Sequence, residues 1–125
     1  MDNLERIHQV DAAWNQRDWE LYGSLIADNF QGWMNGDSQP HDKAEHLRRG
    51  QAYCAAYPGN RIHCDPYLDA FASEDGQRTC TISTVTASSS DAADQRAMLM
   101  VVCHWRDGQI VRQRESICTD PFVPA

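Results

Sequence analysis

One pair of residues suited to proton transfer lies at the start of the strand-rich half of the chain. His63 and Asp65 are separated by one residue, so on a strand both side chains lie on the same face. A histidine beside a carboxylate titrates near neutral pH and can act as a general acid or base. The pattern is also typical of a hydrogen-bonded structural histidine, and it leaves both interpretations open.

Hydroxyl side chains follow on a strand predicted over residues 78–87. Thr81, Ser83 and Thr84 could orient a ligand oxygen, and we keep Ser83 as a candidate binding residue. Threonine is also a good strand former, so an ordinary structural role explains the same residues. Apolar residues occur on both faces of this strand, and the pattern therefore does not decide which face points inward.

The cysteines indicate thiols rather than disulfides or a metal site. Their number is odd, their spacing is wide and no C-x-x-C motif occurs, so we expect reduced thiols in a cytoplasmic protein. His63-Cys64 and Cys103-His104 are neighbours on predicted strands and point to opposite faces, which disfavours chelation of one ion. The five residues are Cys54, Cys64, Cys80, Cys103 and Cys118.

Length and charge exclude several classes of protein. We expect residues 1–125 to form one domain with a core of its own, and 42% hydrophobic residues is close to the globular norm. The net charge of −7 argues against nucleic acid as the main partner, because binding phosphates requires clustered basic residues. No apolar run approaches the roughly 18 residues that a membrane span needs. The charged start, MDNLERIHQ, has no signal-peptide core.

Helices are predicted in the first half of the chain. Asp2 with Glu5, and Asp42 with Glu45, have the spacing of capping boxes at two helix starts. Apolar residues at helical spacing follow the first box, and a shorter helix is expected around residues 19–26. A short strand and a turn are expected within residues 28–37, and Pro58-Gly59 ends the third helix.

Strands are predicted in the second half of the chain, joined by short loops and therefore antiparallel. Asp107-Gly108 between two strands is the strongest hairpin signal, and a serine-rich loop is expected over residues 88–94. Pro66 interrupts the first strand and predicts a bulge or an edge position. The four expected strands are Arg61–Ser73, Arg78–Ala87, Arg96–Trp105 and Gln109–Thr119. Helices followed by such strands form an α+β domain.

Three stretches resemble the nuclear transport factor 2-like superfamily, nearest its SnoaL-like, polyketide cyclase-like branch. They are WNQRDWELYGSLIADNF, HDKAEHLRRGQAYCAAYPGNRI and WRDGQIVRQRESICTDP, the last with its late Asp-Pro. Their order is similar to the superfamily's opening helices, third helix and closing hairpin. The resemblance implies a cone-shaped, cystatin-like fold, in which a curved antiparallel sheet wraps around three N-terminal helices.

The same resemblance implies a site on the last strand. Several enzymes of this branch carry an inward-pointing acid there, and the matching position is Glu115, our first candidate for a catalytic acid or base. The cyclases' partner histidine corresponds to Val101, and the stretch TCTISTVTA lacks the charged pair of the epoxide hydrolases. His63 is therefore the candidate partner for Glu115. We place Val101 and Gln113 among the binding residues.

Aromatic residues are candidates for the walls of an apolar pocket. Trp33 and Tyr53 are the better candidates because the short first strand and the third helix border the open end of this fold, whereas Trp14 is expected in the core. His41 and His46 stand at a helix start and are expected to be solvated.

The leading hypothesis is a protein that binds a small apolar or polycyclic ligand and uses Glu115 for isomerisation, cyclisation, dehydration or hydrolysis. Such chemistry needs no metal or organic cofactor. The alternative is a non-catalytic ligand carrier or a dimeric protein-interaction module. Met98, Met100 and Val102 alternate with apolar residues of the opposite face, and we expect a homodimer through this outer sheet face.

Overall fold

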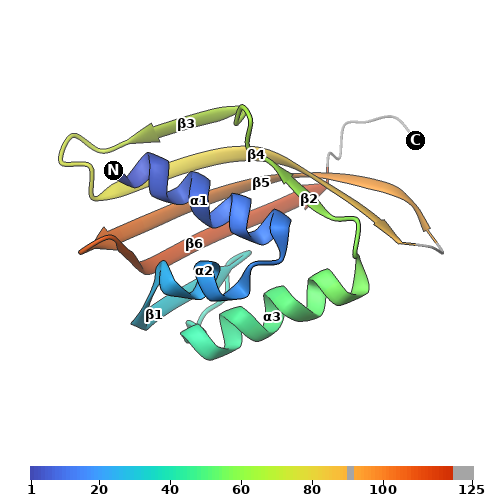
Figure 1. Cartoon of the computed structure of the whole chain (residues 1–125), viewed down its shortest axis with the longest axis horizontal. Coiled ribbons are helices and arrows are strands. Elements are labelled where there is room, and N and C mark those ends of the chain that lie inside the picture. Colours follow the sequence, from blue (N-terminus) through green and yellow to red (C-terminus); the bar gives the residue numbers. More distant parts are fainter. Residues whose placement is uncertain (90–91, 120–125) are drawn as a thin grey trace.

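The computed structural model describes residues 1–89 and 92–119, and it places three helices over one face of a curved, unclosed sheet (Figure 1). The helices are α1 (Asn3–Gln16), α2 (Trp19–Ser24) and α3 (Lys43–Ala56). The strands are β1 (Ile26–Met34), β2 (Arg61–His63), β3 (Asp69–Ala72), β4 (Arg78–Ser89), β5 (Ala92–Arg106) and β6 (Gln109–Thr119). The α+β cone expected from the sequence is confirmed.

Two of the helices begin at the predicted caps. The Asp2 carboxylate accepts a hydrogen bond from the Glu5 backbone N–H at 2.8 Å, and Asp42 does the same for Glu45 at 2.9 Å. Each bond satisfies a backbone donor that has no partner inside the helix, a contribution of about 1 kcal/mol. These caps fix where α1 and α3 start, and so which side chains face the sheet.

The sheet has the order β1-β6-β5-β4-β2, and β3 pairs with β4 beside β2. The pairs β4–β5 and β5–β6 are antiparallel, as expected from their short connections. β1 instead pairs parallel with β6, with Met34 opposite Glu115, so the sheet is mixed rather than wholly antiparallel. A parallel pair needs a long connection, and the chain between residues 34 and 109 supplies it.

The predicted strand boundaries differ from the observed ones in several places. The loop expected over residues 88–94 is mostly strand, because β4 continues to Ser89 and β5 begins at Ala92 rather than at Arg96. The strand expected over residues 61–73 is divided into β2 and β3 on either side of Pro66, which has no N–H to contribute to a ladder. The Asp107-Gly108 hairpin is confirmed, and both residues have the positive φ that a tight turn requires, 53° and 77°. In the serine-rich loop, Ser90 and Asp91 lie outside the described residues, as does the late Asp120-Pro121.

Strand alternation separates a buried inner face from an exposed outer face. On β5, Leu99, Val101 and Cys103 are buried toward the helices, whereas Met98 and Met100 are exposed on the other side. The register of β4 places Thr81 and Ser83 opposite Val101 and Leu99, which settles the inward parity that the sequence left open. The hydroxyls of Thr81 and Ser83 therefore belong to the interior, whereas Thr84, opposite the exposed Met98, lies on the outer face.

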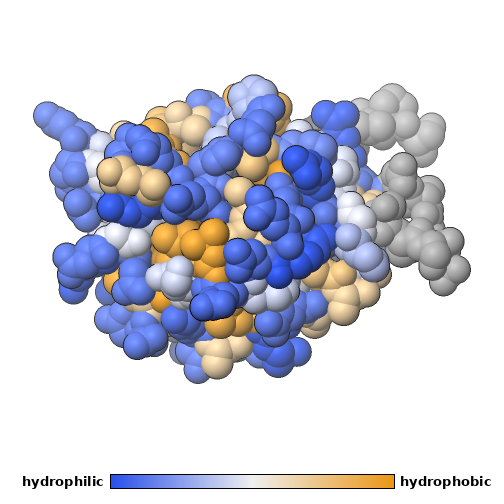
Figure 2. All heavy atoms as spheres, viewed as in Figure 1, coloured by the Kyte–Doolittle hydropathy of each residue, from blue (hydrophilic) through white to orange (hydrophobic). Residues whose placement is uncertain are grey.

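The helix-bearing side of the molecule is mostly hydrophilic, interrupted by a small apolar patch (Figure 2). The core beneath it joins the first helix to the β1–β6 end of the sheet through Ile7, Ile26, Phe30 and Ile110, each at most 2% exposed. Within the described residues, no helix has the length and apolar character needed to span a membrane.

Candidate active site

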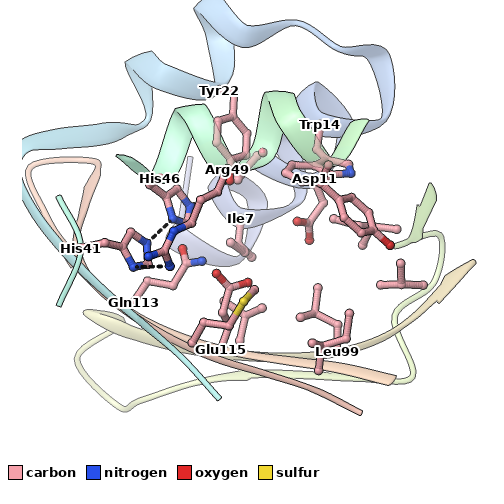
Figure 3. Close-up of a pocket in the computed structure, with 18 residues that line it drawn as sticks. Ile7, Asp11, Trp14, Tyr22, His41, His46, Arg49, Leu99, Gln113 and Glu115 are labelled. Carbon is pink, nitrogen blue, oxygen red and sulfur yellow. Dashed lines mark hydrogen bonds between the residues drawn. The ribbon is translucent and has the colours of Figure 1, made fainter. Parts of the chain in front are cut away.

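A cavity of about 250 Å³ lies between the helices and the inner face of the sheet. Figure 3 shows its lining residues, with side chains from the helices facing side chains from the strands. Apolar groups form most of its wall: Ile7, Val10, Trp14, Ile62, Val85, Leu99, Val101 and Ile117. A hollow of this kind with a few polar groups is the usual form of a small-molecule site.

Two carboxyl groups line this cavity from different elements. Glu115 comes from β6 on the sheet side and Asp11 from α1 on the helix side (Figure 3). The pKa of Glu115 is raised to about 7, chiefly by burial and also by the charge of Asp11, while a hydrogen bond from Gln113 and the charge of Arg49 act in the opposite direction. A carboxyl with this pKa exists in both protonation states near neutrality and can either accept or donate a proton.

Asp11 differs from Glu115 in having a strong hydrogen-bond donor. The Tyr67 hydroxyl donates to an Asp11 carboxylate oxygen at 2.6 Å. Burial raises the pKa of Asp11 to about 6, and the bond from Tyr67 and the charge of His8 act in the opposite direction. Asp11 is therefore held by a protein partner, whereas Glu115 is the better placed to exchange a proton with a ligand.

A chain of polar contacts forms another part of the wall. The Tyr22 hydroxyl lies 3.0 Å from Nε2 of His46, whose Nδ1 lies 2.8 Å from Nε2 of His41. Nδ1 of His41 lies 3.3 Å from Nη1 of Arg49. Burial lowers the pKa of both histidines, that of His46 to about 4, and the charge of Arg49 contributes in each case. We call these four residues the relay.

Two glycines allow close packing around the cavity. Gly32 on β1 exchanges two backbone hydrogen bonds with His41, each 2.9 Å long. A Cβ on Gly32 would lie 2.6 Å from Nε2 of His41, so only glycine lets the imidazole lie against the strand. A Cβ on Gly50 would lie 2.8 Å from the ring of Trp14, so α3 packs against α1 at this position for the same reason.

Four of the predicted site residues line the cavity: Glu115, Tyr53, Val101 and Gln113. Ser83 is buried in the inner sheet face but is not part of the lining. Trp33 lies outside the lining and packs under the guanidinium of Arg114, 4.2 Å from the ring centroid.

The expected partnership between His63 and Glu115 is absent from the described contacts. His63 is exposed and its Nε2 lies 2.8 Å from Oγ1 of Thr86, outside the cavity lining. Asp65 pairs with His8 at 2.6 Å rather than with His63. His63 and Asp65 do not share a strand face as predicted, because His63 is the last residue of β2 and Asp65 lies beyond the end of the strand.

The prediction that His41 and His46 are solvated is wrong. They are 9% and 7% exposed, because His41 pairs with Gly32 of β1 and His46 packs against Tyr22 of α2. Sequence reasoning also missed Asp11, Tyr22 and Arg49. The sequence did contain a signal for Asp11, which falls four residues after Ile7 on the apolar stripe of α1. Burying a carboxylate there costs free energy, so its presence points to a specific role.

A second polar cluster lies outside the cavity lining. His8, Cys64 and Asp65 each offer one possible metal ligand, all within 4.8 Å of one another. Burial raises the pKa of the Cys64 thiol to about 11, which disfavours the thiolate that a metal requires, and the Asp65 carboxylate already pairs with His8. These contacts account for the cluster without an ion.

The sequence itself carries the family assignment. The SnoaL-like domain family matches residues 7–113, which span both sides of the cavity, and the chain belongs to this family. No curated protein matches the sequence.

Solved structures with the same fold are distant in sequence. The proposed polyketide cyclase IdmH from Streptomyces antibioticus is 19% identical with a TM-score of 0.78, over 90% of this chain and 89% of that one. A cystatin fold protein from Novosphingobium aromaticivorans is 21% identical with a TM-score of 0.76, over 92% and 97%. An LEH-like epoxide hydrolase from M. tuberculosis is 13% identical with a TM-score of 0.75, over 92% and 81%. These similarities establish the fold.

Proposed function

We propose that this protein binds a small, largely apolar ligand in the cavity and catalyses proton transfer on it with Glu115. The reaction class is a cofactor-independent isomerisation, cyclisation or dehydration. The observation that carries the proposal is a carboxyl group of pKa about 7 facing a mostly apolar cavity. A general acid or base works best when its pKa is close to the operating pH.

The size of the cavity narrows the ligand. Its volume of about 250 Å³ lies just below the range of typical ligand sites, which span roughly 300–1,000 Å³. We therefore favour a ligand of one or two rings over a larger polycycle. Trp14 and Tyr53 offer flat aromatic surfaces beside such a ring.

Exchange of carbon-bound protons tests the proposal directly. We would incubate the protein with 2-tetralone, a bicyclic ketone, in D₂O and follow loss of the α-proton signal by NMR. The wild-type protein should accelerate exchange over buffer, with a rate that rises as the pH passes about 7 and Glu115 ionises. Glu115→Gln retains the shape and removes the base, so exchange should fall by about 100-fold or more.

A matched control is Glu74→Gln, which alters an exposed carboxylate in the turn before β4 and should leave exchange unchanged. Binding without catalysis would appear as a ligand that saturates the protein while exchange remains at the buffer rate. That outcome would replace the enzyme proposal with the ligand-carrier function. Equal exchange rates in Glu115→Gln and wild type would remove Glu115 from the mechanism.

We also propose that the outer face of the sheet forms a homodimer. Met98 and Met100 are 46% and 41% exposed on β5, and Val102 lies on the same face. Exposed apolar side chains in a row favour burial against a second copy. Met98→Lys combined with Met100→Lys should convert a dimer into a monomer in analytical ultracentrifugation. A wild-type protein that sediments as a monomer at high concentration would contradict this proposal.

A further inference from the structure

The relay has a fixed hydrogen-bond direction, set at its outer end by Arg49. A guanidinium group has donors but no acceptor, so Nη1 of Arg49 donates to Nδ1 of His41. Neutral His41 then carries its proton on Nε2 and donates to Nδ1 of His46. His46 in turn carries its proton on Nε2, which donates to the Tyr22 hydroxyl oxygen.

The contact between Arg49 and His41 also excludes the opposite hydrogen-bond direction, in which Tyr22 donates to His46. If Tyr22 donated to His46, each imidazole would carry its proton on Nδ1, and the N–H of His41 would face the N–H of Arg49. Doubly protonated imidazoles would produce the same clash of donors. The lowered pKa of both histidines is consistent with single protonation, since burial and the charge of Arg49 disfavour the imidazolium.

This direction leaves the Tyr22 proton without an acceptor. Tyr22 is 6% exposed, and within the described part of the chain its hydroxyl makes one hydrogen bond, the one it accepts from His46. Its ring is held by Trp14, Trp19 and His46, with centroids 5.5–6.1 Å away. Figure 3 shows the hydroxyl on the helix side of the cavity, across from Glu115 on the sheet side. A buried donor of this kind calls for an acceptor on the ligand.

We propose that Tyr22 is a catalytic residue that donates a hydrogen bond to a carbonyl oxygen of the ligand, and that the substrate class is therefore an enolisable ketone or aldehyde. His46, His41 and Arg49 are positioning residues that aim the Tyr22 proton into the cavity. The inference rests on the proposed function, because it assigns the electrophile to the reaction in which Glu115 is the base.

The step is balanced within the site. The Glu115 carboxylate removes a proton from the carbon next to the carbonyl, and the electrons of that C–H bond form a C=C bond. The carbonyl π electrons move to oxygen, where the enolate accepts the hydrogen bond from Tyr22. Glu115 then returns its proton to carbon. In D₂O the Glu115 carboxyl first exchanges the abstracted proton for a solvent deuteron, so return to the same carbon replaces the α-proton by deuterium, and return to a different carbon gives isomerisation.

The relay direction can be measured without any ligand. Nitrogen-15 NMR of the ligand-free protein at pH 7.5 should find both His41 and His46 protonated on Nε2 alone. Arg49→Met removes the donor that sets the direction, so the His46 proton should distribute over both nitrogens. Arg48→Met is the matched control, because Arg48 bonds the same Glu45 carboxylate from an exposed position and should leave the tautomers unchanged.

A His46 protonated on Nδ1 in the wild type would overturn the proposal, since Tyr22 would then donate to His46. Unchanged tautomers in Arg49→Met would overturn the role of Arg49. Both outcomes are independent of whether the protein has activity.

The role of Tyr22 is tested with 2-tetralone labelled with carbon-13 at the carbonyl. Tyr22→Phe keeps the ring and removes the donor, so α-proton exchange should fall about 100-fold in kcat with a much smaller change in KM. The carbonyl resonance of bound ligand should lie downfield in the wild type and return toward its free position in Tyr22→Phe. Backbone NMR spectra of the variant confirm that it is folded.

The two proposals fail differently. Wild-type exchange that depends on Glu115 but is unaffected by Tyr22→Phe would overturn the present inference and leave the proposed function intact. Exchange that is absent from the wild type would overturn the proposed function. A downfield carbonyl shift that vanishes in Tyr22→Phe would then still establish Tyr22 as a donor to a bound ketone, and its absence would overturn both.

Discussion

The two carboxyl groups of the cavity and the two imidazoles of the relay experience the same burial with opposite consequences. Burial raises the pKa of Glu115 to about 7 and that of Asp11 to about 6, because the charged form of an acid is the deprotonated one. It lowers the pKa of His46 to about 4, because the charged form of an imidazole is the protonated one. An apolar cavity thus drives both kinds of group toward their neutral forms.

The comparison also fixes how stability changes with pH. A raised carboxyl pKa stabilises the folded state at low pH, and this stabilisation is lost as the pH rises from the unfolded value, 4.5 for Glu115, through about 7. A lowered imidazole pKa favours the folded state above 6.5, and that advantage is lost as the pH falls toward about 4. The contributions of Glu115 and His46 have opposite slopes between pH 4.5 and 6.5, so each partly cancels the other in the wild-type protein there.

Glu115→Gln should break this balance with the largest effect. Glutamine imitates the protonated acid at every pH, so the variant keeps the stability that wild type loses between pH 5 and 8. The full shift corresponds to about 3 kcal/mol in the free energy of unfolding. Urea denaturation at both pH values measures it, with Glu74→Gln as control. A variant with the same pH dependence as wild type would show that Glu115 is solvated.

His46→Gln should reveal the opposite slope. Loss of the two relay contacts of His46 lowers stability at all pH values, but the variant should lose about 3 kcal/mol less than wild type on acidification from pH 7 to 4. The measurement is the same denaturation series. His63→Gln changes an exposed histidine outside the cavity and should follow the wild-type curve. A steeper acid loss in His46→Gln than in wild type would contradict the neutral relay.

Gly32→Ala should displace the relay without changing any titratable group. The new methyl would lie 2.6 Å from His41, so the imidazole must move away from His46, at a cost of roughly 1–2 kcal/mol. Thermal unfolding measures the loss. Gly23→Ala is the control, since its Cβ would meet Leu47 at an ordinary 3.7 Å. Equal melting temperatures for Gly32→Ala and wild type would mean that His41 does not need this space.

Asp11→Asn should produce the smallest effect, because it changes only the interaction between the two carboxyl groups. The negative charge of Asp11 raises the pKa of Glu115, but less than burial does, so removing it should lower that pKa modestly. The midpoint of the pH profile for ketone exchange should move to lower pH. Asparagine can still accept the Tyr67 hydrogen bond, which limits structural change. A midpoint that moves upward would contradict the charge interaction.

The sequence predicted local features well because their causes are local. The Asp2 and Asp42 caps and the Asp107-Gly108 turn depend on a few neighbouring residues, and all three are present. The inward position of Glu115 was implied by the resemblance of the closing hairpin to that of the superfamily, and Glu115 lines the cavity. The relay could not be predicted, because the burial of His41 and His46 depends on the pairing of Gly32 with His41 and on the packing of α2.

The parallel pairing of β1 with β6 has a consequence for how the protein forms during synthesis. Backbone and side-chain bonds join Asn35, just after β1, to Glu115 and Ile117 on β6. The strand that carries Glu115 is thus also the strand that joins the first half of the chain to the second. Until the ribosome has released β6, the apolar faces of the helices have only an incomplete sheet to cover them. Formation of the cavity and escape from aggregation are therefore the same late event, which depends on contacts between distant parts of the chain.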